Sequence, residues 1–203
     1  MIRNLVFDMG MVLMNYHPLQ ACRAVAKDEA AAQQIMTALF NHPEWVGLDD
    51  GSITETELAS RAMARIPDED TRALVLPLLL GMPHNVLSPI PEMADVLDRL
   101  FARGFHIYLL SNAGWNVSNN RGMIPHIGRF HGVVFSVEEA LLKPDPAIYR
   151  RLTDRYGLKP EECLFIDDLP QNAEGARRVG WQAYQFDGDI AAFTRYVEAL
   201  PNP

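Results

Sequence analysis

The chain has 203 residues, of which 48% are hydrophobic, so it is long enough for one large domain or for a core with an insertion. Its formal net charge of −8 argues against nucleic acid and anionic membrane surfaces as partners, because both attract basic patches. The two cysteines lack metal-ligand spacing and the N-terminus lacks the pattern of a signal peptide, so we expect a cytoplasmic protein.

The first predicted element is a strand over residues 5–7, and Asp8 follows it directly. Residues 19–80 are predicted to be helical, and within them Thr54 and Glu57 have the spacing of a capping box at a helix start. Glycine and proline residues then mark a linker that ends near residue 89. The helical stretch therefore interrupts the chain just after the first strand, where it can hang over that strand's carboxyl end.

The rest of the chain alternates between strands and helices. Short apolar runs suit strands that are buried on both faces, and repeated strand–helix units predict a parallel sheet with right-handed crossovers. Glycines at the ends of the apolar periodic segments fit helix C-termini. The expected strands are residues 107–110, 133–135, 164–166 and one containing Tyr184 and Phe186, and the expected helices are residues 91–103, 146–156, 172–179 and 190–200.

Polar clusters follow four of the predicted strands. In open α/β sheets, ligands bind beyond the carboxyl ends of the strands, so these clusters should converge although they are far apart in sequence. A single Asp after a strand is equally well a helix cap or a turn residue, but four such junctions in one chain favour a charged pocket. The residues concerned are Asp8, Ser111, Asn112, Lys143, Asp167 and Asp168.

The four clusters resemble, in order, the four motifs of the haloacid dehalogenase superfamily, whose members are mostly phosphatases. Val6-Phe7-Asp8-Met9-Gly10 resembles the first motif, and the others correspond to residues 110–112, 143–146 and 165–168. The resemblance implies a Rossmann-like three-layer α/β core with a parallel sheet and an inserted small α-helical cap. The expected core is residues 1–14 and 89–203, and the expected cap is residues 15–88.

The resemblance also implies how a phosphoryl group is bound and transferred. Asp8 is the expected nucleophile, which would form an aspartyl-phosphate that water then cleaves. Ser111 and the main-chain N–H of Asn112 would bind the phosphoryl oxygens, and Lys143 would neutralise their charge. Taken alone, Lys143 would be read more readily as a surface lysine before a helix. The expected partner is a small phosphorylated metabolite, and the oligomeric state is left open.

Mg²⁺ is the cofactor that the resemblance implies. Asp8, Asp168 and the main-chain carbonyl of Gly10 are the expected ligands, since Mg²⁺ prefers oxygen ligands and keeps several waters. Asp167 would act on the metal through a water or through a hydrogen bond to a ligand. Asn172 is expected to support this acidic cluster.

Gly10 departs from the usual first motif, which has a second Asp at this position as general acid and base. Such assistance is worth roughly 10²–10⁴ in rate. One interpretation keeps phosphatase activity on esters with good leaving groups, since the chain is most similar to a branch with an Asp-x-Gly motif that includes sugar phosphatases. A cap residue, solvent or the substrate would then supply the missing group. His17, His42 and Glu44 are candidates by residue type and region only.

Two other interpretations stay open. A 2-haloacid dehalogenase also lacks the second Asp, and Tyr149 fits that activity, although it fits a helix core position better. Asp167 and Asp168 argue against it, because two acidic residues are unfavourable in a metal-free site for an anionic substrate. The third interpretation is a non-catalytic binding or regulatory module. Substrate specificity is expected to depend on the cap and on residues near Asn15 and Trp115.

Overall fold

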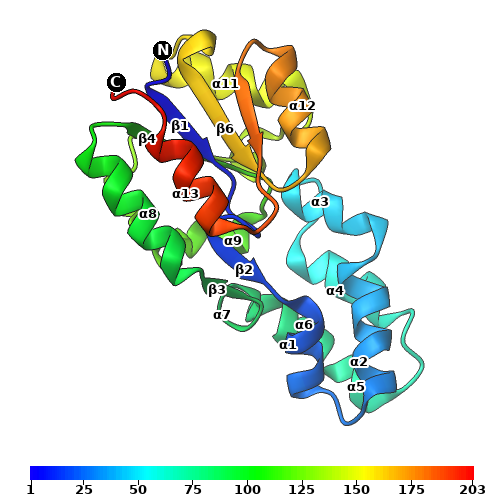
Figure 1. Ribbon diagram of the computed structural model, residues 1–203. Coiled ribbons are helices and arrows are strands. Elements are labelled where there is room, and N and C mark those ends of the chain that lie inside the picture. The colour runs from blue at the N-terminus through cyan, green and yellow to red at the C-terminus, as the bar shows by residue number, and fades with distance from the viewer.

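Five parallel strands form the central sheet in a computed structural model that describes residues 1–203. The strands lie in the order β5-β4-β1-β6-β7, with β1 in the middle (Figure 1). All four neighbouring pairs are parallel, which confirms the sheet predicted from the strand–helix alternation. The strands are β1 (Asn4–Phe7), β4 (His106–Ser111), β5 (Gly132–Phe135), β6 (Cys163–Asp167) and β7 (Gln182–Gln185).

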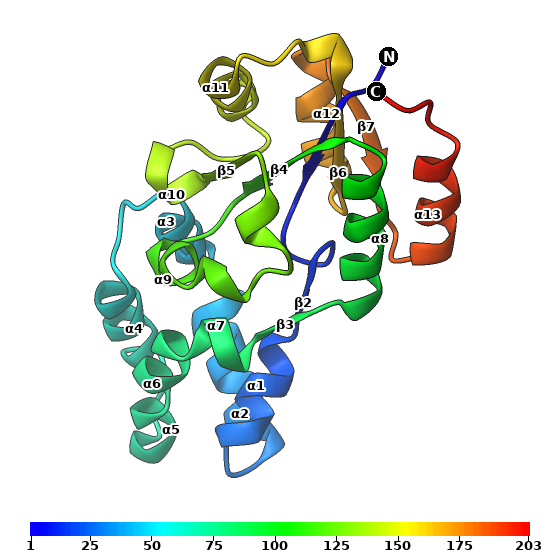
Figure 2. The ribbon, with the colours of Figure 1, turned by 90° about the vertical axis from the view of Figure 1, so that its left-hand side faces the viewer.

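Helices cover both faces of this sheet, so the molecule has the three layers that were predicted. Side chains alternate between the two faces of a strand. In β1, Leu5 and Phe7 join the hydrophobic cluster that includes α8 (Pro91–Ala102) and α13 (Ile190–Glu198). Val6 belongs instead to the cluster with α11 (Pro146–Tyr156) and α12 (Pro170–Arg178). Figure 2 shows α8 and α13 together on one side of the sheet.

Residues 18–85, called the helical segment below, form short helices rather than one continuous helical run. Three of these helices begin where an Asp or Thr side chain caps the first turn, which explains why the segment is broken up. The α-helices are α1 (Pro18–Val25), α2 (Glu29–Ile35), α3 (Val46–Asp49), α4 (Glu55–Met63), α5 (Glu69–Ala73), α6 (Val75–Leu80) and α7 (Met82–Asn85). A π-helical turn over Met36–Phe40 and a 3₁₀ turn over Pro43–Trp45 connect α2 to α3.

The predicted capping box is present at the start of α4. The N–H of Glu57 donates to the Thr54 hydroxyl oxygen at 3.2 Å, and the N–H of Thr54 donates to the Glu57 carboxylate at 2.8 Å. Both exposed backbone donors at this helix end are therefore satisfied. The sequence pattern located this helix start correctly.

A two-stranded antiparallel ribbon links the sheet to the helical segment. Its strands are β2 (Met14–Tyr16) and β3 (Leu87–Pro89), with Tyr16 opposite Leu87 and Met14 opposite Pro89. The chain thus enters and leaves the helical segment side by side, below the sheet in the view of Figure 1. The expected boundaries between core and cap fall on this ribbon, and the division of the chain into these two parts stays a prediction.

The remaining elements agree with the sequence interpretation apart from their ends. α12 begins at Pro170 rather than Asn172, because proline suits the first turn of a helix. β7 ends at Gln185, so Phe186 lies just beyond the strand, where its N–H donates to the carbonyl of Asp167 at 2.9 Å. Two short helices, α9 (Trp115–Asn119) and α10 (Ser136–Glu139), follow β4 and β5. None of the helices is long and apolar enough to span a membrane.

Candidate active site

The carboxyl ends of β1, β4 and β6 open onto one cavity of about 390 Å³. The sheet brings these ends together because β1 lies between β4 and β6, with Phe7 opposite Leu109 and Ile166. Helical-segment residues close the other side of the same cavity. The predicted site residues that line it are Asp8, Gly10, Ser111, Asn112, Lys143 and Asn172.

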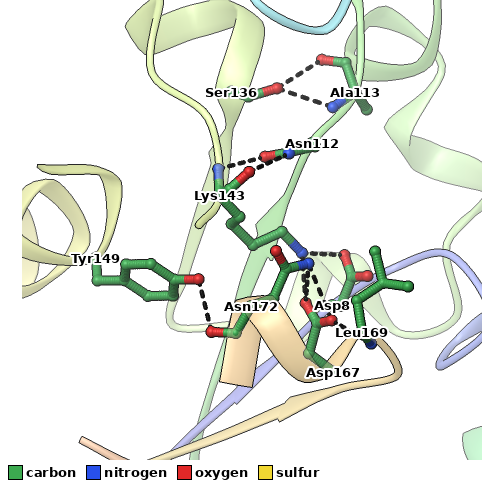
Figure 3. Close-up of polar contacts among 9 residues, drawn as sticks. All are labelled: Asp8, Asn112, Ala113, Ser136, Lys143, Tyr149, Asp167, Leu169 and Asn172. Carbon is green, nitrogen blue, oxygen red and sulfur yellow. Dashed lines mark hydrogen bonds and ion pairs between the residues drawn. The ribbon is translucent and has the colours of Figure 1, made fainter. Parts of the chain in front are cut away.

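Lys143 is the central charge of the site. Its Nζ lies 2.7 Å from Oδ1 of Asp8 and 2.7 Å from Oδ2 of Asp167. Figure 3 draws this group of side chains with its contacts as dashed lines. The Lys143 side chain is only 1% exposed. Burial by itself would lower the pKa of Lys143, but the two carboxylates outweigh burial and raise this pKa above its usual value. Lys143 is therefore a buried, charged ammonium, and not the surface lysine that residue type alone would favour.

Asp167 is fully buried, lies outside the cavity lining and is held from several sides. The side-chain amide of Asn172 donates to both of its oxygens, at 3.0 and 3.1 Å, and the N–H of Leu169 donates to Oδ1 at 2.9 Å. The hydroxyl of Tyr149 donates in turn to the carbonyl of Asn172 at 2.8 Å (Figure 3). Asn172 therefore contacts the acidic cluster through Asp167, and its supporting role stays a prediction.

Asn112 fixes the loop that carries Lys143. Its side-chain amide donates to the carbonyl of Lys143 at 3.0 Å, and its Oδ1 accepts from the Lys143 N–H at 2.8 Å. This pair of bonds connects the end of β4 to the loop after β5. Ser111, which precedes Asn112, is buried at the wall of the cavity.

Three carboxylates form a cluster that could hold a cation. Asp8, Asp167 and Asp168 each offer an oxygen, and these oxygens all lie within 4.8 Å of one another. Burial raises the pKa of Asp8 to about 7, with Lys143 opposing the rise and Asp167 adding to it. Burial and Asp167 also raise the pKa of Asp168, which is half-buried. A single ammonium does not balance three carboxylates, so this set of hard oxygen donors fits a divalent cation such as Mg²⁺.

The turn after Asp8 contains a residue with an unusual backbone conformation. Met11 has a φ of +56°, a left-handed conformation that glycine adopts more easily than other residues. Its N–H donates to the carbonyl of Met14 at 2.7 Å, which closes a tight turn toward β2. A Cβ on Gly10 would meet nothing within 4 Å, so a side chain at that position would have open space.

The three candidates for the missing acid–base group do not line the cavity. Glu44 forms ion pairs with Arg61 and Arg65, and the N–H of Glu44 donates to His42 Nδ1 at 3.3 Å. His17 borders a separate depression near the β2–β3 ribbon. Specificity was expected from the cap and from residues near Asn15 and Trp115. These two residues lie outside the lining, and Trp115 is 48% exposed, but their neighbours Tyr16 and Val117 line the cavity.

Other residues of the helical segment reach the cavity instead. Sequence reasoning missed them because they are ordinary apolar or aromatic residues and an Asp outside any recognised motif. Only the packing of short helices decides which side chains point inward. A chain segment that packs over the ends of buried strands was the one available signal. The helical-segment residues are Phe40, Trp45, Asp49 and Met82, and Tyr16 and Leu87 of the β2–β3 ribbon line the cavity beside them.

Comparison with known proteins identifies the family. Residues 2–180 match the model of the haloacid dehalogenase-like hydrolases, so the chain belongs to this hydrolase family, as its motifs predicted. A solved structure of a predicted hydrolase of this family from Porphyromonas gingivalis is 29% identical, with a TM-score of 0.75 over 98% of this chain and all of that one. A magnesium and inorganic phosphate complex of a mutant family enzyme from Bacteroides thetaiotaomicron has 23% identity and a TM-score of 0.71, over 93% of this chain and 96% of that one.

The curated relatives differ in length and activity. Acyl-CoA dehydrogenase family member 10 from Mus musculus is 27% identical over 98% of this chain, but the chain spans only 19% of that protein. The sesquiterpene phosphatase astK of Aspergillus oryzae is 24% identical over 92% of this chain and 90% of its own. Relatives that match shorter parts include a glyceraldehyde 3-phosphate phosphatase and an (S)-2-haloacid dehalogenase.

Proposed function

We propose that the protein is a Mg²⁺-dependent phosphatase of small phosphomonoesters that works through an aspartyl-phosphate. The observation that carries this proposal is the buried Lys143, held 2.7 Å from Asp8 beside a further carboxylate, Asp168. A nucleophilic carboxylate with a fixed positive charge and a cation site suits phosphoryl transfer, which depends on positioning and charge neutralisation. The phosphatases among its relatives support the same reaction class.

In the proposed mechanism, Asp8 attacks the phosphorus and the ester oxygen leaves. Lys143 orients the Asp8 carboxylate and stabilises the negative charge of the phosphoryl oxygens, with Ser111 and the N–H of Asn112 as hydrogen-bond donors. Mg²⁺, held by Asp8, Asp168 and the carbonyl of Gly10, would reduce the repulsion between the nucleophile and the phosphate. Asp167 and Asn172 keep Lys143 in place. Water then cleaves the aspartyl-phosphate and releases phosphate.

The dehalogenase alternative receives less support from the site. Tyr149 is fully buried, and its hydroxyl donates to the carbonyl of Asn172, so it has a packing and positioning role. The acidic cluster with Asp168 would repel a haloacid carboxylate unless a cation were bound. A non-catalytic module is also less well supported, because such a module has no need of a buried lysine paired with the predicted nucleophile.

The cavity lining bears on the substrate. We propose that the helical segment acts as a cap whose side chains contact the alcohol part of the ester. Three of the four helical-segment side chains in the lining are apolar or aromatic, namely Phe40, Trp45 and Met82, and Leu87 of β3 adds a further apolar side chain. A sugar needs several polar partners, whereas these side chains favour an ester with apolar surface. A sugar phosphate thus stays a prediction, and phosphates of apolar alcohols or phenols belong in the same test.

A substrate screen tests the proposed function. Phosphorylated metabolites, sugar phosphates and aryl phosphates would be incubated with the protein and Mg²⁺, and phosphate release would be measured. We expect turnover that EDTA stops and added Mg²⁺ restores. Release of halide from 2-chloropropionate without metal, and no phosphate release from any ester, would support the dehalogenase instead.

A further inference from the structure

The proposed reaction has a proton-transfer problem at Gly10. When Asp8 displaces an alkoxide, the leaving oxygen needs a proton unless the alcohol is unusually acidic. Gly10 has no side chain to provide it, and the space where one would point is open. An ionisable side chain elsewhere in the cavity lining could supply this proton.

Asp49 is a suitably placed carboxyl group. It is the last residue of α3 and lines the same cavity as Asp8, Gly10 and Lys143. The only other ionisable side chain that the helical side contributes to this lining is Tyr16, and burial raises the Tyr16 pKa far above neutrality. The Asp49 carboxyl forms no hydrogen bond or ion pair within the protein. The neighbouring Asp50 differs, because its Oδ1 accepts from the Ser52 N–H at 2.8 Å.

The position of Asp49 is fixed against the strand ends. The hydroxyl of Ser136, the first residue after β5, donates to the carbonyl of Asp49 at 2.5 Å. The N–H of Ala113 donates to the same hydroxyl oxygen at 2.9 Å, and Ala113 lies two residues after Ser111 (Figure 3 draws this bond). A Cβ on Gly114 would lie 3.0 Å from the carbonyl oxygen of Leu48, so the two segments approach closely. Asp49 is thus anchored to the loop that follows the phosphate-binding strand.

We infer that Asp49 is the general acid and base of this site and replaces the carboxyl group that Gly10 lacks. This inference rests on the proposed phosphatase function. In the first step, an Asp8 oxygen bonds to phosphorus, the bond from phosphorus to the ester oxygen breaks, and the Asp49 carboxyl gives its proton to that oxygen. In the second step, Asp49 takes a proton from the water that attacks phosphorus. The bond to Asp8 then breaks, which releases hydrogen phosphate and restores both side chains.

The electrostatic surroundings favour a protonated Asp49 near neutral pH. Burial raises the pKa of Asp49 to about 7; Asp50 and Asp8 add to the rise and Lys143 opposes it. A carboxyl group with a pKa near the working pH can both give and take a proton. This supports the assignment, which depends in the first place on where Asp49 lies.

A leaving-group series with Asp49→Asn tests the assignment. For alkyl phosphates, kcat/KM should fall by roughly 10²–10⁴, the usual contribution of general acid–base catalysis. For p-nitrophenyl phosphate, kcat/KM should change by less than about 10-fold, because a phenolate of low pKa leaves without a proton. Its kcat should still fall, and a burst of one p-nitrophenol per protein should precede slow turnover, since water attack on the aspartyl-phosphate also needs the base.

Two further variants make the result specific. Asp70→Asn is the control, since Asp70 is an exposed carboxylate of the helical segment that does not line the cavity, and its kinetics should stay close to wild type. Gly10→Asp has open space for its side chain, so adding it to Asp49→Asn should restore alkyl phosphate hydrolysis at least in part. A structural role for Asp49 predicts equal losses for alkyl and aryl esters and no rescue by Gly10→Asp.

The inference and the proposed function can fail separately. If wild type hydrolyses phosphate esters, Asp8→Asn is inactive and Asp49→Asn keeps full activity on alkyl phosphates, the assignment of Asp49 is wrong while the phosphatase proposal stands. If wild type hydrolyses no ester with Mg²⁺, the phosphatase proposal itself is wrong. Circular dichroism and thermal melting of each variant check that the chain is folded.

Discussion

The ammonium of Lys143 lies 2.7 Å from the carboxylate of Asp8, and the two side chains are 1% and 11% exposed. Both charges are thus removed from water and depend on each other and on Asp167 for stabilisation. The arrangement orients the Asp8 carboxylate at the cavity. It also means that changes to this pair should affect the stability of the fold as well as activity.

Removal of the Lys143 side chain should lower the free energy of unfolding, and by a larger amount at high pH. Lys143→Ala leaves Asp8 and Asp167 buried without a positive partner, which costs about 3–5 kcal/mol of unfolding free energy when both are ionised. At pH 5 the loss should be smaller, because Asp8, whose pKa is already raised to about 7, can take up a proton in the folded state. Urea unfolding at pH 5 and pH 8 measures the difference. The control is Lys159→Ala, an exposed lysine, and an equal loss at both pH values would contradict the prediction.

Replacement of the nucleophile should remove turnover and keep the fold. Asp8→Asn has nearly the same shape but cannot form the aspartyl-phosphate, so we expect a loss of about 10³-fold or more in kcat. Phosphate release measures the effect, and circular dichroism shows whether the chain remains folded. Undiminished phosphate release by this variant would overturn the mechanism.

Asp168 should matter for the cation more than for stability. Asp168→Asn removes one of the clustered carboxylates, so we expect Mg²⁺ affinity to fall by roughly 10-fold or more. Mg²⁺ that binds the folded state raises the melting temperature in a concentration-dependent way, and titration of this shift gives the affinity. Asp187→Asn, at an exposed carboxylate outside the site, serves as control. A shift with the same Mg²⁺ dependence as wild type would exclude Asp168 as a ligand.

Asp49→Asn should make the metal-free protein more stable than wild type, and by a larger amount at pH 8 than at pH 5. The folded-state pKa of Asp49 is raised from 3.8 to about 7, so the folded state holds more protons than the unfolded state between these values. Stability is therefore lost through this group as the pH rises from about 4 to 7. Because Asp49 is partly exposed to solvent, the relief should be about 1–2 kcal/mol at pH 8 and smaller at pH 5. Thermal melts in EDTA at both pH values test it, and the reverse pH trend would refute it.

Much of the fold could be predicted because its strands carry a local signal. Continuous apolar runs, such as the one from Leu5 to Phe7 in β1 and those in β4 and β6, indicate strands buried on both faces. The strand ends in a parallel sheet meet at one edge, so the positions of Asp8, Ser111 and Lys143 relative to one another followed from topology. These residues do line one cavity, although their chemical roles remain predictions.

The helical side of the cavity could not be predicted in the same way. His42 and Glu44 were chosen by residue type, but Glu44 is held by Arg61 and Arg65 on the surface of the helical segment. Asp49 reaches the cavity because Ser136, 87 positions away, anchors its main-chain carbonyl. Hydrogen bonds between such distant positions leave no periodic pattern in one sequence. The sequence therefore could not predict that Asp49 lines the cavity or how it is oriented there.

The β2–β3 ribbon has a consequence for how this protein can change over evolution. Tyr16 and Leu87 are paired neighbours, so the residues between them are joined covalently to the rest of the chain at one pair of adjacent positions. Insertions, deletions or exchange of the 70 residues in between can therefore leave the register of the five-stranded sheet untouched. New substrate preferences can arise in that stretch while the reacting groups on the strand ends keep their spacing.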